Sequence, residues 1–152
     1  MKAKISLAVA LVTFFSGCTS VPMANKDVSD QAKQFSTPSE GKVGLYVFRD
    51  SALGAALKKD VWVDGKCLGE TAPNIFFYEE LEDKPQHTIS TESEFSPNEM
   101  TLKTEAGNNY FVRQYIKLGV FVGDAGLESV SEDEGKRIVA KLKMALKGNC
   151  SK

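Results

Sequence analysis

The sequence predicts a β-rich α+β fold, with an antiparallel sheet or small sandwich of about seven short strands and one C-terminal amphipathic helix. Turn-forming residues recur at intervals of roughly nine to twelve residues from Val43 onward, and β-branched or aromatic runs lie between them. After Ser131 the apolar residues change to helical spacing. A chain of 152 residues, 42% hydrophobic and 26% charged, suits one folded domain.

The expected strands are bounded by turns rich in Gly, Pro, Asn and Asp. Asp64-Gly65 is a strong two-residue hairpin signal, because both residues tolerate a positive φ. In the last run, Tyr110–Lys117, successive side chains alternate between two faces, which predicts the longest strand. In chain order, the predicted strands are Val43–Arg49, Asp60–Val63, Lys66–Glu70, Ile75–Leu81, His87–Glu92, Met100–Thr104 and Tyr110–Lys117.

A helix is predicted to begin at Ser131, because the following residues form a capping box. In this motif Ser131 is the N-cap and Glu134 reaches back to it. Acidic residues in the first turn suit the positive end of the helix dipole. Gly148 is expected to end the helix. The apolar stripe of this helix consists of Ile138, Val139, Leu142, Ala145 and Leu146.

The first 17 residues are typical of a secretory signal peptide. The basic start Met1–Lys4 precedes the apolar run Ile5–Phe15, whose 11 residues are too few for a comfortable transmembrane helix. A buried N-terminal helix is the alternative, but it leaves the basic start unexplained. We therefore expect export from the cytoplasm.

Phe15-Ser16-Gly17-Cys18 resembles the lipobox of bacterial lipoproteins, although Phe15 stands where leucine is usual. The resemblance implies that residues 1–17 are removed and that Cys18 becomes the N-terminus, carrying acyl chains such as palmitate. Two or three chains anchor a protein stably in a membrane. Thr19 replaces the aspartate associated with inner-membrane retention, which implies the outer membrane. Residues 18–41 are then a lipidated tether, and residues 42–150 a single β-rich domain.

The charge of the chain excludes one class of function, and its cysteines predict a disulfide. The chain carries 19 basic and 20 acidic side chains, a net charge of -1, which excludes the basic footprint of a nucleic-acid binder. Once Cys18 is lipidated, Cys67 and Cys150 remain. An even pair in an exported protein is expected to form a disulfide. Such a bond would fasten the end of the C-terminal helix to the strand after the Asp64-Gly65 turn.

Three longer stretches resemble a known family. They are Val63–Leu81, His87–Leu102 and Gly107–Glu128. Together with Cys18 they resemble the small proteobacterial lipoproteins grouped as the domain of unknown function DUF2846. The pattern VDGK…LG…HTIS is also similar to the small β-modules called PEGA-like. The resemblance spans about Gly41 to Leu142 and implies a secreted, lipid-anchored domain, but it brings no activity and no catalytic residues.

The sequence lacks the residue sets that most hydrolases and metal sites need. His87 is the single histidine, and no Gly-x-Ser-x-Gly stretch accompanies it. No Cys-x-x-Cys or histidine pair is present, so no metal or cofactor is expected. Arg113 is expected to be either one partner of a salt bridge across strands, with Glu92 or Glu94, or an exposed charge, rather than a ligand-binding residue. We therefore expect the protein not to be an enzyme.

A glycine-flanked apolar triplet, Val120-Phe121-Val122, has two interpretations. It is either core beside a tight turn, or an exposed loop that contacts a partner. The expected function is a non-enzymatic binding or scaffolding module at the periplasmic face of the outer membrane. Its partners would be the membrane, through the lipid anchor, and an unknown envelope protein. A small-ligand-binding envelope domain is the alternative, and a hydrolase the least favoured one.

Overall fold

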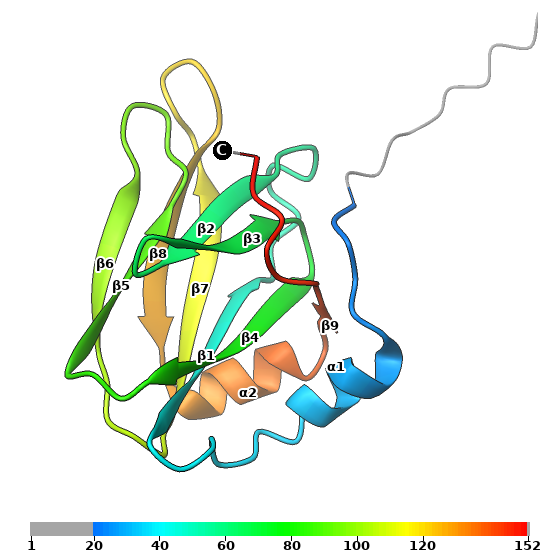
Figure 1. Cartoon of the computed structure of the whole chain (residues 1–152). Coiled ribbons are helices and arrows are strands. Elements are labelled where there is room, and N and C mark those ends of the chain that lie inside the picture. Colours follow the sequence, from blue (N-terminus) through cyan, green and yellow to red (C-terminus); the bar gives the residue numbers. More distant parts are fainter. Residues whose placement is uncertain (1–19, 152) are drawn as a thin grey trace, which may run out of the picture.

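The computed structural model describes residues 20–151 and has three layers (Figure 1). A four-stranded sheet, in the order β3-β2-β5-β6, packs on a five-stranded sheet, in the order β8-β7-β1-β4-β9. Helices α1 and α2 form the third layer, which confirms the predicted β-rich α+β class. The elements are α1 Lys26–Ala32, β1 Lys42–Arg49, β2 Lys59–Val63, β3 Lys66–Thr71, β4 Ile75–Glu82, β5 Gln86–Thr91, β6 Asn98–Lys103, β7 Asn109–Lys117, β8 Asp124–Val130, α2 Glu132–Val139 and β9 Lys143–Met144.

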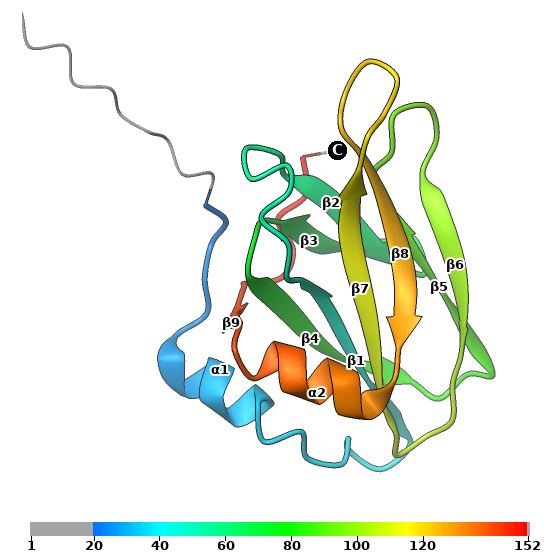
Figure 2. The same ribbon diagram turned by 180° about the vertical axis from the view of Figure 1, so that it is seen from behind.

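The position of β1 explains its almost continuously apolar sequence. β1 is the central strand of the five-stranded sheet, and both of its faces are covered. Leu45 and Val47 enter the core between the two sheets. Tyr46 and Phe48 enter a second core, which the same sheet shares with the helices. Figure 2 shows the helix layer from behind.

The sheets differ from the purely antiparallel arrangement expected from the sequence. β1 pairs with β7 in parallel, and β4 pairs with β9 in parallel. Between β1 and β7 the chain forms β4 and all four strands of the other sheet, and β7 then runs in the same direction as β1. Strand β8 is absent from the sequence prediction, because Gly119, Gly123 and Gly126 together indicate a turn. Gly126 fits there because a Cβ atom would lie 2.5 Å from the Tyr115 ring.

Helix α2 begins as predicted and ends earlier. The Ser131 side chain accepts a hydrogen bond from the Glu134 N–H, as an N-cap should. The carboxylate of Glu134 binds Arg113 instead of reaching back, with an N–O distance of 3.0 Å. The helix stops at Val139, because the chain after it pairs with β4 as strand β9. Ala145 and Leu146, predicted to be helical, lie beyond that strand.

The described part of the predicted tether, residues 20–41, is packed on the domain, so a tether is wrong for this segment. Val21 is buried in the core between the sheets. Met23 forms an antiparallel bridge with Ala145. Helix α1, whose residues Ser29 and Ala32 are buried, covers the sheet. Polar composition suggested a linker, but a few apolar residues suffice to dock it. Within residues 20–151 no helix is long and apolar enough to cross a membrane.

The last nine described residues form a strap across both sheets, which we call the C-terminal strap (residues 143–151). Its first part pairs with β4 of the five-stranded sheet. Its second part bonds β3 of the other sheet, since Gly148 N–H donates to the Leu68 carbonyl at 2.9 Å and Glu70 N–H to the Asn149 carbonyl at 2.7 Å. The strap therefore joins the edges of the two sheets.

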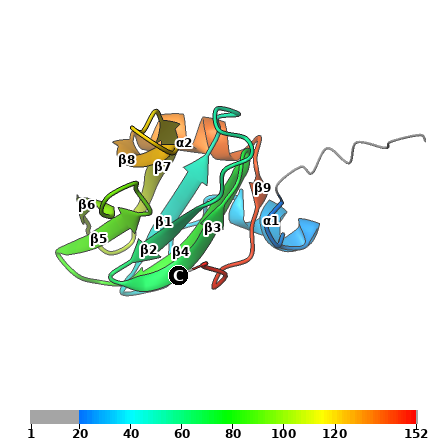
Figure 3. The ribbon, with the colours of Figure 1, turned by 90° about the horizontal axis from the view of Figure 1, so that it is seen from above.

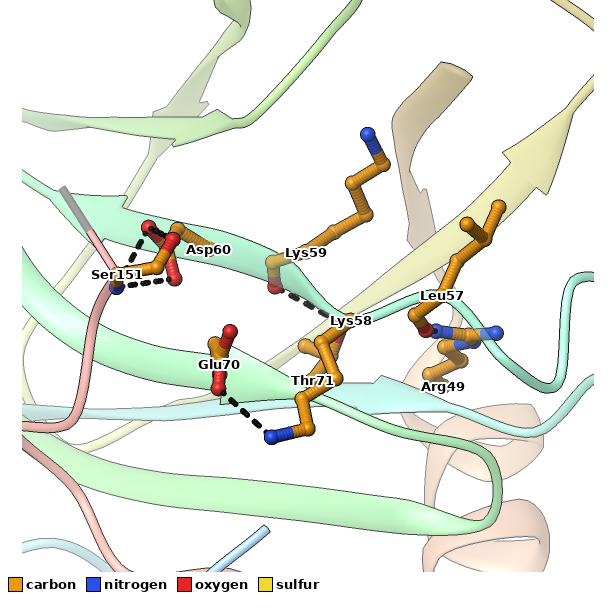
Figure 4. A network of polar contacts seen from close by, with 8 residues as sticks. All are labelled: Arg49, Leu57, Lys58, Lys59, Asp60, Glu70, Thr71 and Ser151. Carbon is orange, nitrogen blue, oxygen red and sulfur yellow. Dashed lines mark hydrogen bonds and ion pairs between the residues drawn. The ribbon is translucent and has the colours of Figure 1, made fainter. Parts of the chain in front are cut away.

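Two further contacts fasten the end of the strap. Cys67 and Cys150 form a disulfide, as expected from the sequence, with a Cα–Cα distance of 6.1 Å. One residue later, Ser151 donates its N–H and its hydroxyl to the buried carboxylate of Asp60, at 3.0 and 2.8 Å (Figure 4). The chain end is thus held covalently and by charge-assisted hydrogen bonds.

Replacing Cys150 with Ser should lower the free energy of unfolding by about 2–5 kcal/mol, because the disulfide closes a long loop. The cysteines are 83 residues apart in sequence. Urea unfolding of the wild type and of Cys150→Ser, each with and without reductant, measures the effect. Reductant should destabilise the wild type alone. Two alkylatable thiols in the unreduced, denatured wild type would show that the bond does not form.

Candidate functional site

Two neighbouring hairpin loops carry exposed apolar side chains at one end of the sandwich (Figure 1). One loop connects β5 to β6, and the other connects β7 to β8. Leu118 is 93% exposed, Phe121 83% and Phe95 75%, although their sizes favour burial. We call this set the apolar tip; it consists of Phe95, Leu118, Val120, Phe121 and Val122. Of the two interpretations of Val120-Phe121-Val122, the exposed loop is the one found.

Glu94 holds the β7–β8 loop from the neighbouring hairpin. Its carboxylate accepts hydrogen bonds from the backbone N–H groups of Val120, at 2.6 Å, and of Phe121. The Val122 N–H lies 3.3 Å from the same carboxylate. Because the backbone donors turn inward to this anion, the apolar side chains are left outside. Gly119 permits the close approach, since a Cβ there would lie 2.5 Å from the Glu94 carboxylate and 1.9 Å from the Val122 carbonyl.

Asp124 joins the same two loops at their base. Its carboxylate accepts from the Ala125 N–H at 2.8 Å and from the Glu94 N–H at 3.4 Å. Lys117 lies 3.2 Å away on the other arm of the hairpin. A hydrogen bond from the Ser93 side chain, followed by the Ala125 N–H and Lys117, lowers the pKa of Asp124 to about 2. The two hairpins therefore behave as one unit.

This arrangement suits recognition of another protein. A binding surface gains affinity when its loops are already ordered before the partner arrives. At the apolar tip, the carboxylates of Glu94 and Asp124 order the loops by binding their backbone N–H groups. The apolar side chains are not needed for this and remain exposed. Large exposed apolar side chains that cluster in this way mark interaction sites. Sequence reasoning identified only the triplet; Phe95 and Leu118 were missed because nothing in sequence brings the two loops together.

His87 and Arg113, the other two side chains considered in the sequence analysis, have structural roles. His87 is buried, with one ring nitrogen 2.8 Å from the Asp64 carboxylate and the other 3.1 Å from the Glu82 carbonyl. Arg113 was expected to bind Glu92 or Glu94, which is wrong. Its guanidinium forms ion pairs with Asp50, Glu128 and Glu134, at 3.3, 2.7 and 3.0 Å. Neither residue is free to meet a substrate through these groups.

Beneath the tip, a polar core links the sheets and positions the β1–β2 loop. Arg49 is fully buried and donates to the Leu57 carbonyl at 2.7 Å (Figure 4). It also donates to the Gly54 carbonyl at 2.8 Å. Burial lowers the pKa of its guanidinium. Between the sheets, the Gln114 side chain bonds the hydroxyls of Thr71 and Thr91. Both Nη groups of Arg49 and the Gln114 amide bind acceptors of the chain itself, so the polar core is structural. The buried Nε of Arg49 has no hydrogen-bond partner among the described residues.

A cavity of about 310 Å³ lies between α1 and the five-stranded sheet. Tyr46, Tyr78 and Glu80 supply polar atoms to its lining. The Tyr46 hydroxyl donates to the Ala32 carbonyl at 2.8 Å, and the Tyr78 hydroxyl to Glu80 at 3.2 Å. Burial, with Glu80 nearby, raises the pKa of Tyr78 to about 12. The hydroxyls are thus paired already. Among residues 20–151, no three His, Cys, Asp or Glu side chains are placed to hold a metal ion.

Asp124→Asn should weaken the fold at neutral pH and have little effect in acid. The folded-state pKa of about 2 lies below the ordinary aspartate pKa of 3.8. The carboxylate therefore contributes stability above about pH 4, and the contribution, about 1–2 kcal/mol, is lost as pH falls toward 2. Urea unfolding of wild type and variant across this range measures it. Asp83→Asn, at an exposed loop aspartate, is the control; an equal loss at every pH would contradict the prediction.

The predicted lipidation site Cys18 and the predicted signal peptide lie outside the described residues, so the structure does not bear on them. The family model of a protein of unknown function, DUF2846, matches residues 39–127. A protein of Haemophilus influenzae, named as an uncharacterized protein, is 52% identical over 138 residues, covering 91% of this chain and 82% of the relative. No solved structure matches the chain. The chain therefore belongs to the DUF2846 family.

Proposed function

We propose that this protein is a lipid-anchored module of the cell envelope that binds another envelope protein through the apolar tip. The proposal depends on the exposure of Leu118, Val120 and Phe121. They lie on a loop whose backbone N–H groups are bound by the Glu94 carboxylate. An exposed apolar loop that served only to connect two strands would have no need of such support. Burial of one such side chain in an interface contributes about 1.5–3 kcal/mol.

The anchor part of the proposal rests on the sequence. The apolar run Ile5–Phe15 and the lipobox-like residues ending at Cys18 support export, cleavage and lipidation. Thr19 supports delivery to the outer membrane, where the domain faces the periplasm. The disulfide between Cys67 and Cys150 agrees with an oxidising compartment.

The proposed role is non-enzymatic. A general base needs a free atom within reach of a substrate proton. Both ring nitrogens of His87 face acceptors of the fold, and the ring is buried. Binding of a small molecule remains the second candidate, because the cavity under α1 has a volume of about 310 Å³, near the lower end for ligand pockets. The paired hydroxyls of Tyr46 and Tyr78 favour the protein partner instead.

Phe121→Asp should abolish capture of the partner and leave the fold intact, because the side chain is 83% exposed while a charge in an apolar interface is costly. The measurement is cross-linking of the mature lipoprotein in intact envelopes, followed by affinity purification and mass spectrometry. The matched control is Val28→Asp, since this exposed apolar residue lies on α1, away from the tip. Partners that are lost equally from both variants, or kept by both, would refute the tip as the binding site.

Cys18→Ser should prevent lipidation and either release the domain from membranes or leave an uncleaved precursor. The reason is that the thioether to the lipid needs the Cys18 thiol. Detergent phase partition and intact mass measure the result. A variant of normal mature size that still enters the detergent phase would contradict the lipobox interpretation.

A further inference from the structure

The domain is attached to the predicted anchor by very little chain. Only two residue steps separate Cys18 from Ser20, and two residues span at most about 7 Å. Val21 is buried, and Met23 is paired with Ala145, so the chain follows the domain surface from this point. A lipid on Cys18 therefore brings the surface around Ser20 close to the membrane head groups.

That surface is rich in lysine. Lys141 and Lys143 line, together with Ser20, a hollow of about 550 Å³ beside the start of the described chain. Lys33 and Lys143 line an adjoining hollow of about 390 Å³. We call Lys33, Lys141 and Lys143 the basic face. Within residues 20–151 none of the three forms an ion pair, whereas Lys26 beside them binds Asp30.

Exposed apolar side chains accompany these lysines. Met23, which lines both hollows, is exposed. Leu146, on the C-terminal strap, is also exposed, and its N–H donates to the Pro22 carbonyl at 2.8 Å. Lysines whose ammonium groups extend past apolar side chains are typical of surfaces that rest on phospholipid, because the stem stays apolar while the charge reaches a phosphate.

We propose that the basic face docks on anionic phospholipid head groups of the bilayer that holds the Cys18 lipid. This inference rests on the proposed lipid anchor. Figures 1 and 3 show α1, β9 and the start of the described chain on one side of the sandwich, and the β5–β6 and β7–β8 hairpins on the other. Docking through the basic face therefore leaves the apolar tip facing away from the membrane, open to a partner.

The test uses the purified, lipidated mature protein, inserted into vesicles of phosphatidylcholine or of phosphatidylcholine with phosphatidylglycerol. A membrane-impermeant amine reagent labels exposed lysines, and mass spectrometry measures the rate at each site. Labelling of the basic face should be slower by about fivefold or more on the anionic vesicles, since a lysine at an anionic surface contributes about 1 kcal/mol. Lys66 on β3 and Lys103 on β6 are exposed and line neither hollow, so they should be labelled equally on both.

Charge reversal provides the matched comparison. Lys141→Glu combined with Lys143→Glu should return Lys33 to its rate on neutral vesicles, whereas Lys66→Glu with Lys103→Glu should leave it protected. Equal rates on both vesicles, or protection of Lys117 at the base of the tip, would overturn the proposal. The intact mass distinguishes failure of the lipid anchor from failure of the docked face. An unlipidated mature chain refutes the anchor and with it this inference. A lipidated chain with unprotected lysines refutes the docked face alone.

Discussion

The hydrogen bonds of the C-terminal strap to both sheets are the constraint on which the rest of the structure depends. A sandwich of two small sheets has open edges, and an unpaired edge exposes backbone donors and acceptors. The strap pairs with β4 and then with β3, and it ends in the Cys67–Cys150 disulfide and the bonds from Ser151 to Asp60. It also carries the pairing partners of the N-terminal segment, Met144, Ala145 and Leu146. One short segment thus fixes the sheets relative to each other and holds the beginning of the domain in place.

In the β5–β6 and β7–β8 hairpins, carboxylates order the loops in the way that apolar burial orders other parts of the fold. Glu94 accepts from backbone N–H groups of the β7–β8 loop, and Asp124 bonds the β5–β6 hairpin at its base. Each carboxylate replaces water as the acceptor for loop amides, so the loop is ordered without hiding its side chains. The polar core beneath, in which Gln114 bridges Thr71 and Thr91, links the sheets below this end. The order of the loop therefore depends on its backbone, whereas the proposed binding would use its exposed side chains.

The N-terminal segment gives the molecule an orientation. Val21 is buried and α1 is packed on the sheet, so a lipid at Cys18 would hold the domain against the membrane rather than at the end of a flexible linker. The basic face and the apolar tip lie on different sides of the sandwich. In the proposed arrangement the basic face lies toward the bilayer and the apolar tip points into the periplasm. The proposed partner of the tip is then a protein that reaches the membrane surface from the periplasmic side.

Local patterns in the sequence determined the elements, and tertiary contacts decided how they are used. Periodicity and turn residues predict seven of the strands, and a local motif predicts the Ser131 N-cap. The even number of cysteines left after Cys18, together with the predicted export, indicates the disulfide. Strand β8 was hidden, because Gly126 is explained only by the Tyr115 ring across the ladder. The end of α2 was misplaced, because pairing with β4 outweighs helical spacing after Val139. Glu94 shows the limit most clearly: sequence suggested Arg113 as its partner, and the fold gave it the backbone of a loop 26 residues away. Such a contact depends on how two hairpins meet, and no local pattern records that.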